Sequence, residues 1–203
     1  MSTPQKMSAM AKKIATLDPA FLPAIKNLEP CRFGLEKPTS TNYQSLVRAV
    51  IAQQVSTKAA ATIGKRLEVM CGGRITVERV AKLSLKEIQS AGLTGAKVRT
   101  LDELTRAILE GRVEIKKFTY MNDEEIMGQL LPLFGFGKWT IEMFLMFQLG
   151  RIDIWPVDDL AVRRGWDNLH FNKDAIKPKA LMAEGDLFAG MRSVVAWYCW
   201  RAS

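Results

Sequence analysis

The sequence predicts an all-α protein, and the prediction depends on three observations. Helical periodicity recurs along the chain, no segment alternates apolar and polar residues as a half-buried strand does, and no Asn-Gly hairpin turn is present. Of the 203 residues, 48% are hydrophobic and 25% are charged, which is a globular rather than a disordered composition. The length suits one domain or two small lobes that bury a core.

Helix signals in the first half of the chain are separated by capping residues and glycines. Residues 1–17 are rich in Ala, Met and Lys and suit a short surface helix, and residues 42–54 place their apolar side chains on one face. Ser56 is placed to cap a further helix, which stops at the two glycines 72–73. Residues 84–87 read Ser-Leu-Lys-Glu, a capping box before a short helix.

The second half continues the helical pattern. Residues 97–109 are amphipathic and stop shortly before Gly111, the usual place for a terminating glycine. Asn122 and Asp123 precede a helix with acidic residues in its first turn, where the helix dipole favours them. Further helices are expected at 138–149, at 158–165, around 174–184 and at 186–201.

The least helical stretches, residues 34–42 and 150–157, are the candidate lobe boundaries, because no Gly/Ser linker divides the chain. We therefore expect lobe A to comprise about residues 1–40 plus 158–203, and lobe B about residues 41–157. A cleft between two lobes is a natural place for a functional site.

Charge and cysteine content limit the partners and the compartment. The 29 Lys and Arg against 21 Asp and Glu give a net charge of +8, which suits nucleic acid or an acidic membrane surface, although many basic proteins bind neither. Cys31, Cys71 and Cys199 lie far apart without metal-ligand spacing and are expected to be reduced core residues. The N-terminal segment has no apolar run long enough for a signal peptide or a membrane span. We expect a soluble, intracellular protein.

A glycine-rich turn between two predicted helices is the most informative segment. Gly135 and Gly137 flank Phe136 and allow close backbone approach and positive φ angles. The helix that follows begins at about Lys138 and presents N–H groups that suit a phosphate, with the Lys138 charge and the Thr140 hydroxyl beside them. The alternative is an ordinary corner between helices with a buried Phe136.

An aspartate pair, Asp158 and Asp159, follows Pro156 at the start of another predicted helix. A helix N-terminus stabilises a carboxylate anion, which could in turn stabilise a developing positive charge. The alternative is that the pair only caps the helix. Trp139 follows the glycine turn and Trp155 precedes the aspartates, so both could line a cleft.

Four segments, in this order, resemble the 3-methyladenine DNA glycosylase II family, the alkylated-base branch of the helix-hairpin-helix DNA glycosylases. They are LVRAVIAQQVSTKAAATIGKRL, LFGFGKWTIEMF, WPVDDLAVRRG and RSVVAWYCWR. The resemblance runs from about Tyr43 to Arg201. It implies a two-lobed, all-α glycosylase fold with a cleft between the lobes, a helix-hairpin-helix at 123–149, and no β-domain before Tyr43.

The resemblance also implies a catalytic site. Asp159 matches the family's catalytic aspartate, with Asp158 as its cap or neighbour. Trp200 matches a pocket tryptophan, and a flipped base would stack on Trp139 and Trp200, with Trp155 nearby. Relatives that also cut the DNA strand carry a lysine nucleophile at the position of Trp139, so this protein is expected to remove bases only.

Further residues are implied to contact DNA. Gly135, Gly137 and Thr140 occupy phosphate-contacting positions, together with the neighbouring Lys138. Gln53 and Gln54 lie at the family's wedge, the segment that fills the gap left by a flipped base.

The family hairpin also holds a monovalent cation, Na or K, through main-chain carbonyls, here those of Leu131, Leu133 and Phe136. The family usually has Pro at the position of Phe134, so the turn departs from the pattern there. Relatives with an iron–sulfur cluster carry four closely spaced C-terminal cysteines, and only Cys199 lies in that region. No cluster and no required cofactor are expected.

These assignments together predict a monomeric, monofunctional DNA glycosylase. It would flip alkylated bases such as 3-methyladenine and 7-methylpurines out of double-stranded DNA and hydrolyse the N-glycosidic bond, which starts base excision repair. The partner is alkylated DNA rather than a membrane, in the cytoplasm at the nucleoid or in the nucleus. Two alternatives stay open: a non-catalytic helix-hairpin-helix DNA-binding module, and a glycosylase for another lesion.

Overall fold

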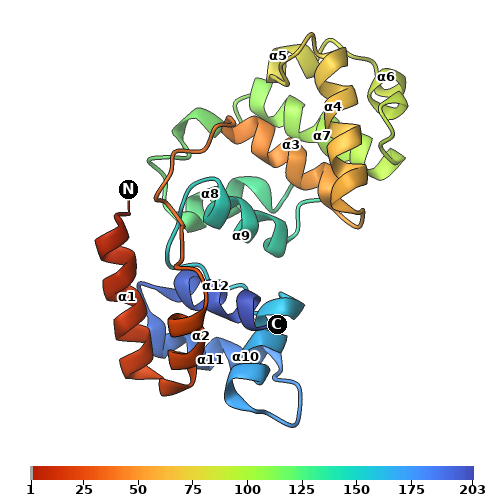
Figure 1. Cartoon of the computed structure of the whole chain (residues 1–203). Helices are drawn as coiled ribbons and strands as arrows, with labels where there is room; N and C mark the ends of the chain where they lie inside the picture. The colour runs from red at the N-terminus through yellow and green to blue at the C-terminus, as the bar shows by residue number, and fades with distance from the viewer. Residues whose placement is uncertain (1) are drawn as a thin grey trace. The chain divides into compact units, whose positions relative to one another are not determined.

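The computed structural model describes residues 2–203, and in that range it contains helices and no β-strand (Figure 1). The all-α prediction is confirmed. In chain order the elements are α1 (Pro4–Leu17), η1 (Pro19–Phe21), α2 (Leu22–Asn27), α3 (Asn42–Ala52), α4 (Thr57–Met70), α5 (Val77–Val80), α6 (Leu85–Ser90), α7 (Gly95–Leu109), η2 (Ile115–Lys117), α8 (Asp123–Leu130), α9 (Lys138–Phe147), α10 (Leu160–His170), α11 (Pro178–Glu184), η3 (Gly185–Phe188) and α12 (Arg192–Ala202).

Capping residues expected from the sequence set the starts of three helices. Ser56 accepts a hydrogen bond from the Ala59 N–H at the start of α4. Ser84 and Asn122 form full capping boxes at the starts of α6 and α8. Such a cap contributes about 1 kcal/mol to helix stability. Local sequence therefore determines these boundaries.

Two of the helix boundaries that differ from the expected ones are explained by a glycine. Helix α10 continues past Gly165 to His170, because Gly165 is a packing glycine rather than a terminator. A Cβ at Gly165 would lie 1.7 Å from the carbonyl oxygen of Cys199 on α12. The predicted helix 186–201 is divided into η3 and α12 because Gly190 takes a φ of +85°.

The chain forms two compact units. Unit 1 comprises Met1–Lys37 and Leu145–Ser203. Within it α10 packs along α12, and the buried ring of Phe21 meets Trp166 and Phe188 edge to face, with centroids 5.7 Å and 5.8 Å away. The two ends of the chain therefore share one core.

Unit 2, Pro38–Phe144, contains α3 to α8 and the start of α9. Its core forms around α3 and α7, whose facing apolar side chains are buried. The Tyr43 hydroxyl lies 2.7 Å from Thr105 Oγ1 inside this core, and burial raises the pKa of Tyr43.

Unit 2 ends at Phe144, within α9, and the chain returns to unit 1 at Leu145. The sequence predicted that this return would occur after residue 157. Residues 145–157 belong to unit 1 because their backbone is bound there: the Ile154 N–H donates to Ser193 Oγ at 2.9 Å, and the Ser193 N–H donates to the Ile152 carbonyl at 3.0 Å. The cleft expected between the lobes stays a prediction.

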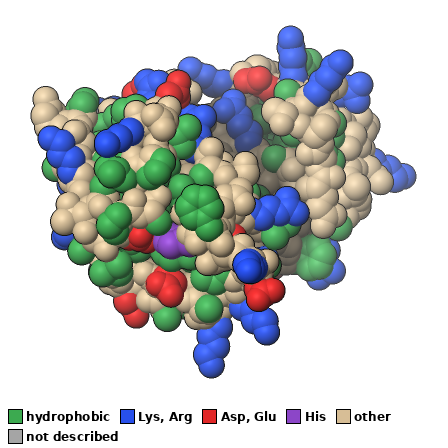
Figure 2. All heavy atoms as spheres, turned by 60° about the horizontal axis from the view of Figure 1, so that its bottom comes forward, with side chains coloured by type: hydrophobic (Ala, Val, Ile, Leu, Met, Phe, Trp, Pro, Cys, Tyr) green, Lys and Arg blue, Asp and Glu red, His purple; other side chains and the backbone are tan. Residues whose placement is uncertain are grey.

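Basic side chains are distributed over the surface. On the face drawn in Figure 2, Lys and Arg project at many separate points among apolar and uncharged surface. Within residues 2–203 the helices are too short or too polar to cross a lipid bilayer.

Candidate functional site

The hairpin turn, residues 131–137, connects α8 to α9 in unit 2 and places each glycine differently. Gly135 has a φ of +81°, and a Cβ there would lie 2.1 Å from Thr100 Oγ1. Only glycine fits this position without a shift of the backbone. At Gly137 a Cβ would meet no atom within 4 Å, so this position is open to solvent or to a ligand. Phe136 is 5% exposed and anchors the turn, as expected.

The first turn of α9 combines backbone N–H groups with one charged side chain. N–H groups in the first turn of a helix have no carbonyl partner within that helix, which suits an anion. The ammonium of Lys138 is 3.5 Å from a carboxylate oxygen of Glu142, and the Lys138 side chain is 43% exposed. Lys138 therefore stays accessible while its charge is partly balanced.

The two glutamines at the end of α3 have different surroundings. Gln53 Nε2 donates to the Gly135 carbonyl at 3.2 Å and to Thr140 Oγ1 at 3.3 Å. Gln54 is exposed and has a φ of +54°, a left-handed conformation that is uncommon for a residue other than glycine. Gln53 thus braces the hairpin turn, and Gln54 projects into solvent.

Thr140 is a buried residue in the first turn of α9. Its side chain is 5% exposed, and its hydroxyl accepts the hydrogen bond from Gln53. The hydroxyl supports the turn from within, and a contact between Thr140 and a phosphate stays a prediction.

Lys97 holds the end of α3, a contact that the sequence did not indicate. Its Nζ donates to the carbonyls of Ile51 and Gln53 at 2.8 Å and 2.7 Å. Partial burial lowers the pKa of this ammonium. The Lys97 contact fixes the backbone from which both glutamines project.

In unit 1, Asp159 is the N-cap of α10 and is 9% exposed. Its Oδ1 accepts hydrogen bonds from the Val162 N–H at 2.9 Å and from the Trp200 indole N–H at 3.1 Å. The cap is therefore Asp159, and Asp158 is its exposed neighbour in the preceding turn, the second of the two roles expected for Asp158. Capping the helix does not exclude the catalytic role that the family resemblance implies for Asp159.

An aromatic surface lies beside this carboxylate. Trp200 stacks on Phe147, with centroids 5.7 Å apart and planes at 27°, and Phe147 is 57% exposed. The buried ring of Phe33 meets the edges of both rings. We call Asp159, Trp200 and Phe147 the carboxylate cluster. The sequence did not single out Phe147 or Phe33, because apolar periodicity does not show which aromatic side chain is exposed.

Comparison with known proteins identifies the family. A model of the HhH-GPD superfamily of base excision DNA repair proteins matches residues 47–189. The chain belongs to this superfamily. DNA-3-methyladenine glycosylase 1 of Schizosaccharomyces pombe is 30% identical over 164 residues, which cover 79% of this chain and 72% of that protein. The family resemblance seen in the sequence is confirmed.

Solved structures show the same HhH-GPD fold. The S. pombe 3-methyladenine DNA glycosylase Mag1, in complex with abasic DNA, matches with a TM-score of 0.81 at 27% identity over 95% of each chain. A DNA-3-methyladenine glycosidase from Bacillus halodurans matches with a TM-score of 0.84 at 28% identity, over 99% of this chain and 89% of that one.

Two tryptophans of this HhH-GPD chain differ in accessibility. Trp139, at the second position of α9, is 44% exposed. Trp155 is 6% exposed, donates its indole N–H to the Leu181 carbonyl at 2.7 Å, and lies 2.4 Å from where a Cβ on Gly185 would stand. Trp155 is therefore a core residue of unit 1, which corrects its expected contact with substrate.

The hairpin carbonyls expected to hold a cation lie on one turn. The Leu133 carbonyl accepts the Phe136 N–H at 3.2 Å, which leaves it one lone pair for another partner. Residues 2–203 contain no group of His, Cys, Asp and Glu side chains able to hold a metal. An ion at this turn would therefore depend on main-chain oxygen atoms, which a monovalent cation accepts.

Proposed function

We propose that this protein is a monofunctional DNA glycosylase that removes alkylated bases, such as 3-methyladenine and 7-methylpurines, from double-stranded DNA and so starts base excision repair. The observation that carries the proposal is the carboxylate cluster, in which two N–H donors fix a buried carboxylate beside a stacked aromatic pair whose Phe147 ring is exposed. The names of the similar proteins support this lesion class.

The aromatic pair suits a cationic base. Alkylation at a ring nitrogen gives the purine a positive charge, and aromatic faces attract cations by about 0.5–2 kcal/mol. Trp200 and Phe147 offer such faces next to Asp159. Stacking of the base on Trp139 as well stays part of the proposal.

The carboxylate acts on the sugar. When the N-glycosidic bond breaks, its electron pair goes to the base and neutralises the purine cation, while positive charge develops at C1′ and the ring oxygen. The Asp159 anion stabilises that charge and orients a water molecule, whose oxygen bonds to C1′ as its proton passes to the Asp159 carboxylate. The base departs without strong acid catalysis, because alkylation has already weakened the bond.

Base flipping assigns roles to the hairpin and to Gln54. A base inside the duplex is out of reach, so the nucleotide must rotate out while another group fills the gap. Gln54, exposed and held in a left-handed conformation, is our choice for that group, since Gln53 is engaged at the hairpin. Gly137, Lys138 and the start of α9 contact phosphates without reading sequence.

A monovalent cation at the hairpin would be held by the carbonyls of Leu131, Leu133 and Phe136. When bound it would supply positive charge beside the phosphate-contacting N–H groups. Replacing Na⁺ or K⁺ by a bulky organic cation at equal ionic strength should then weaken DNA binding, and unchanged affinity would exclude this role.

The absence of strand cleavage is proposed from Trp139. Strand-cutting glycosylases need an amine that forms a Schiff base with the sugar, and an indole cannot supply one. Borohydride should trap no protein–DNA adduct, and abasic sites should stay uncut until alkali is added. A trapped adduct would show an amine nucleophile elsewhere and overturn the monofunctional assignment.

The decisive experiment is to incubate the protein with methylated DNA and identify the free bases released. Release of 3-methyladenine or 7-methylpurines supports the proposal. A non-catalytic DNA-binding module would bind the same DNA and release nothing, and a glycosylase for another lesion would release its base only from uracil-containing or oxidised DNA.

A further inference from the structure

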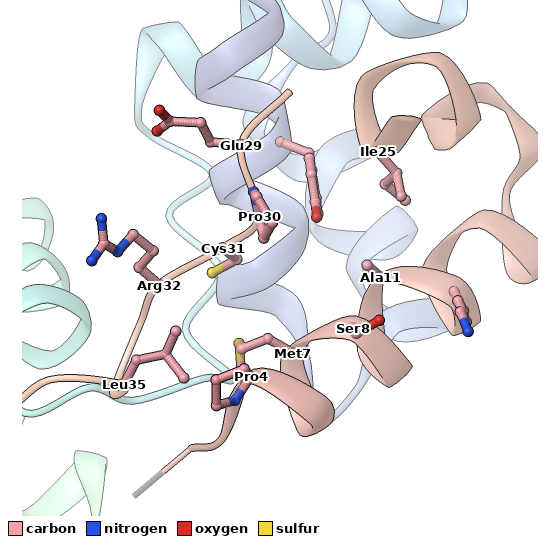
Figure 3. Close-up of a pocket in the computed structure, with 12 residues that line it drawn as sticks. Pro4, Met7, Ser8, Ala11, Ile25, Glu29, Pro30, Cys31, Arg32 and Leu35 are labelled. Carbon is pink, nitrogen blue, oxygen red and sulfur yellow. The ribbon is translucent and has the colours of Figure 1, made fainter. Parts of the chain in front are cut away.

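A hollow in unit 1 is lined by residues other than those of the carboxylate cluster. It has a volume of about 570 Å³ and is bordered by α1, α2, α12 and residues 29–35 (Figure 3). Pockets that bind small molecules typically measure about 300–1,000 Å³. We call it the α1–α12 cavity.

The floor of the α1–α12 cavity is apolar. Met7, Cys31 and Tyr198 each line it and are at most 2% exposed, and Ala11 and Leu35 extend the apolar surface. Burial raises the pKa of the Cys31 thiol to about 11, so the thiol is neutral at neutral pH. Such a floor favours a hydrocarbon group over a polar one.

The mouth of the cavity carries one unbalanced charge. Lys12 and Ser8 are exposed one turn apart on α1, and Lys12 forms no ion pair among residues 2–203. The other charged residues at the rim are balanced: Glu29 pairs with Arg201 at 3.0 Å, and Arg32 pairs with Glu36. An anionic group of a ligand would therefore complement the Lys12 charge at the mouth of the cavity.

The cavity lies outside the base-excision machinery proposed above. Its lining residues fall within 4–35 and at Tyr198, and none of Asp159, Trp200 and Phe147 is among them. On α12, Tyr198 faces the cavity while Trp200, two residues later, contacts Asp159. Residues two apart on a helix point about 200° apart, so these two functions use opposite sides of α12.

We propose that the α1–α12 cavity binds a small anionic amphiphile of the fatty-carboxylate class. The hydrocarbon chain lies on Met7, Ala11 and Cys31, and the carboxylate binds Lys12 Nζ and the Ser8 hydroxyl. This binding is independent of the glycosylase reaction.

The test uses the full chain with ¹³C-methyl methionine and two probes, decanoate and decan-1-ol. Decanoate should shift the Met7 methyl signal saturably and leave Met127, in unit 2, unchanged. Decanol should bind more weakly, because it lacks the charge. Lys12→Gln should weaken decanoate binding about tenfold, the lower end for a hydrogen bond to a charged group. It should leave decanol binding unchanged.

Lys13→Gln is the matched control, because Lys13 is an exposed neighbour that does not line the cavity. It should leave decanoate binding unchanged, and both variants should keep wild-type base release. No saturable Met7 shift would overturn the proposal, as would equal affinity for the two probes or equal effects of the two substitutions. None of these outcomes depends on glycosylase activity.

Discussion

The hairpin turn in unit 2 and the carboxylate cluster in unit 1 are built in opposite ways. The hairpin is shaped by its backbone: Gly135 takes a positive φ, and the buried side chains of Phe136 and Thr140 support the turn from inside. The cluster presents side chains, and its backbone serves only to hold Asp159 through the Val162 N–H.

This difference predicts how each region responds to substitution. The hairpin should be most sensitive to substitutions whose new Cβ disturbs the backbone, and such substitutions should lower the affinity for DNA. The carboxylate cluster should be most sensitive to substitutions that remove a charge or an N–H group, and such substitutions should lower the rate of base release.

The largest effect is expected from Asp159→Asn. Asparagine keeps the size and can still accept the hydrogen bond from the Val162 N–H, so folding and DNA binding should survive. Loss of the negative charge opposite the sugar cation should lower single-turnover base release by about 10²–10³, the usual effect of removing one preorganised electrostatic group.

The matched control is Asp158→Asn, which makes the same carboxylate-to-amide change at an exposed turn residue. It should keep most of the activity. Reversed results would transfer the catalytic role to Asp158, and near-full activity in both variants would refute the mechanism.

Gly135→Ala should affect unit 2 instead. A methyl group there meets Thr100 Oγ1 at 2.1 Å, and the φ of +81° disfavours any side chain. We expect a loss of about 2–4 kcal/mol in the free energy of unfolding, measured by urea denaturation, and weaker DNA binding. Adding Thr100→Ala should restore part of the stability, whereas no rescue would show that the backbone angle alone is responsible.

Trp200→Phe separates stacking from positioning. Phenylalanine keeps an aromatic ring against Phe147 but cannot donate to Asp159 Oδ1. Base release at saturating enzyme should fall about tenfold, as expected for one hydrogen bond to a charged group. Trp197→Phe removes the indole N–H that binds the Glu29 carbonyl and should leave the rate unchanged. Equal losses in both variants would point to general destabilisation.

The smallest effects are expected at the hairpin surface. Gly137→Ala should leave stability nearly unchanged, because no atom lies within 4 Å of the new methyl group, yet weaken binding to all DNA sequences by a similar factor. Lys138→Glu should also reduce the salt dependence of binding, since fewer counterions are released. Unchanged affinity and salt slope in both variants would show that the hairpin does not contact DNA.

The parts of the fold that the sequence predicts are those with local causes. Caps such as Ser84 and Asn122 and the glycine turn around Phe136 depend on neighbours in the chain, and they form as expected. Tertiary contacts decide the rest. In the sequence Gly165 resembles a helix terminator, but in the structure it allows α12 to pack closely against α10. Trp155 is placed to line a pocket in the sequence, but its ring is buried against Gly185.

The candidate site also has features that the sequence predicts and features that depend on tertiary contacts. Asp159 was found through its family motif, and the sequence could not say which aspartate caps the helix. The different surroundings of Gln53 and Gln54 depend on Gly135, far along the chain. The exposure of Phe147 depends on the packing of unit 1, which apolar periodicity in the sequence does not show.

The most direct test of the central claim, that the Asp159 charge stabilises a cationic sugar, is a comparison of two DNA ligands. One carries a protonated pyrrolidine in place of the target sugar, and the other carries a neutral tetrahydrofuran. The wild-type protein should bind the cationic ligand about 10²–10³ more tightly, and Asp159→Asn should abolish that preference while it leaves the affinity for tetrahydrofuran unchanged. An undiminished preference in the Asp159→Asn variant would contradict the mechanism.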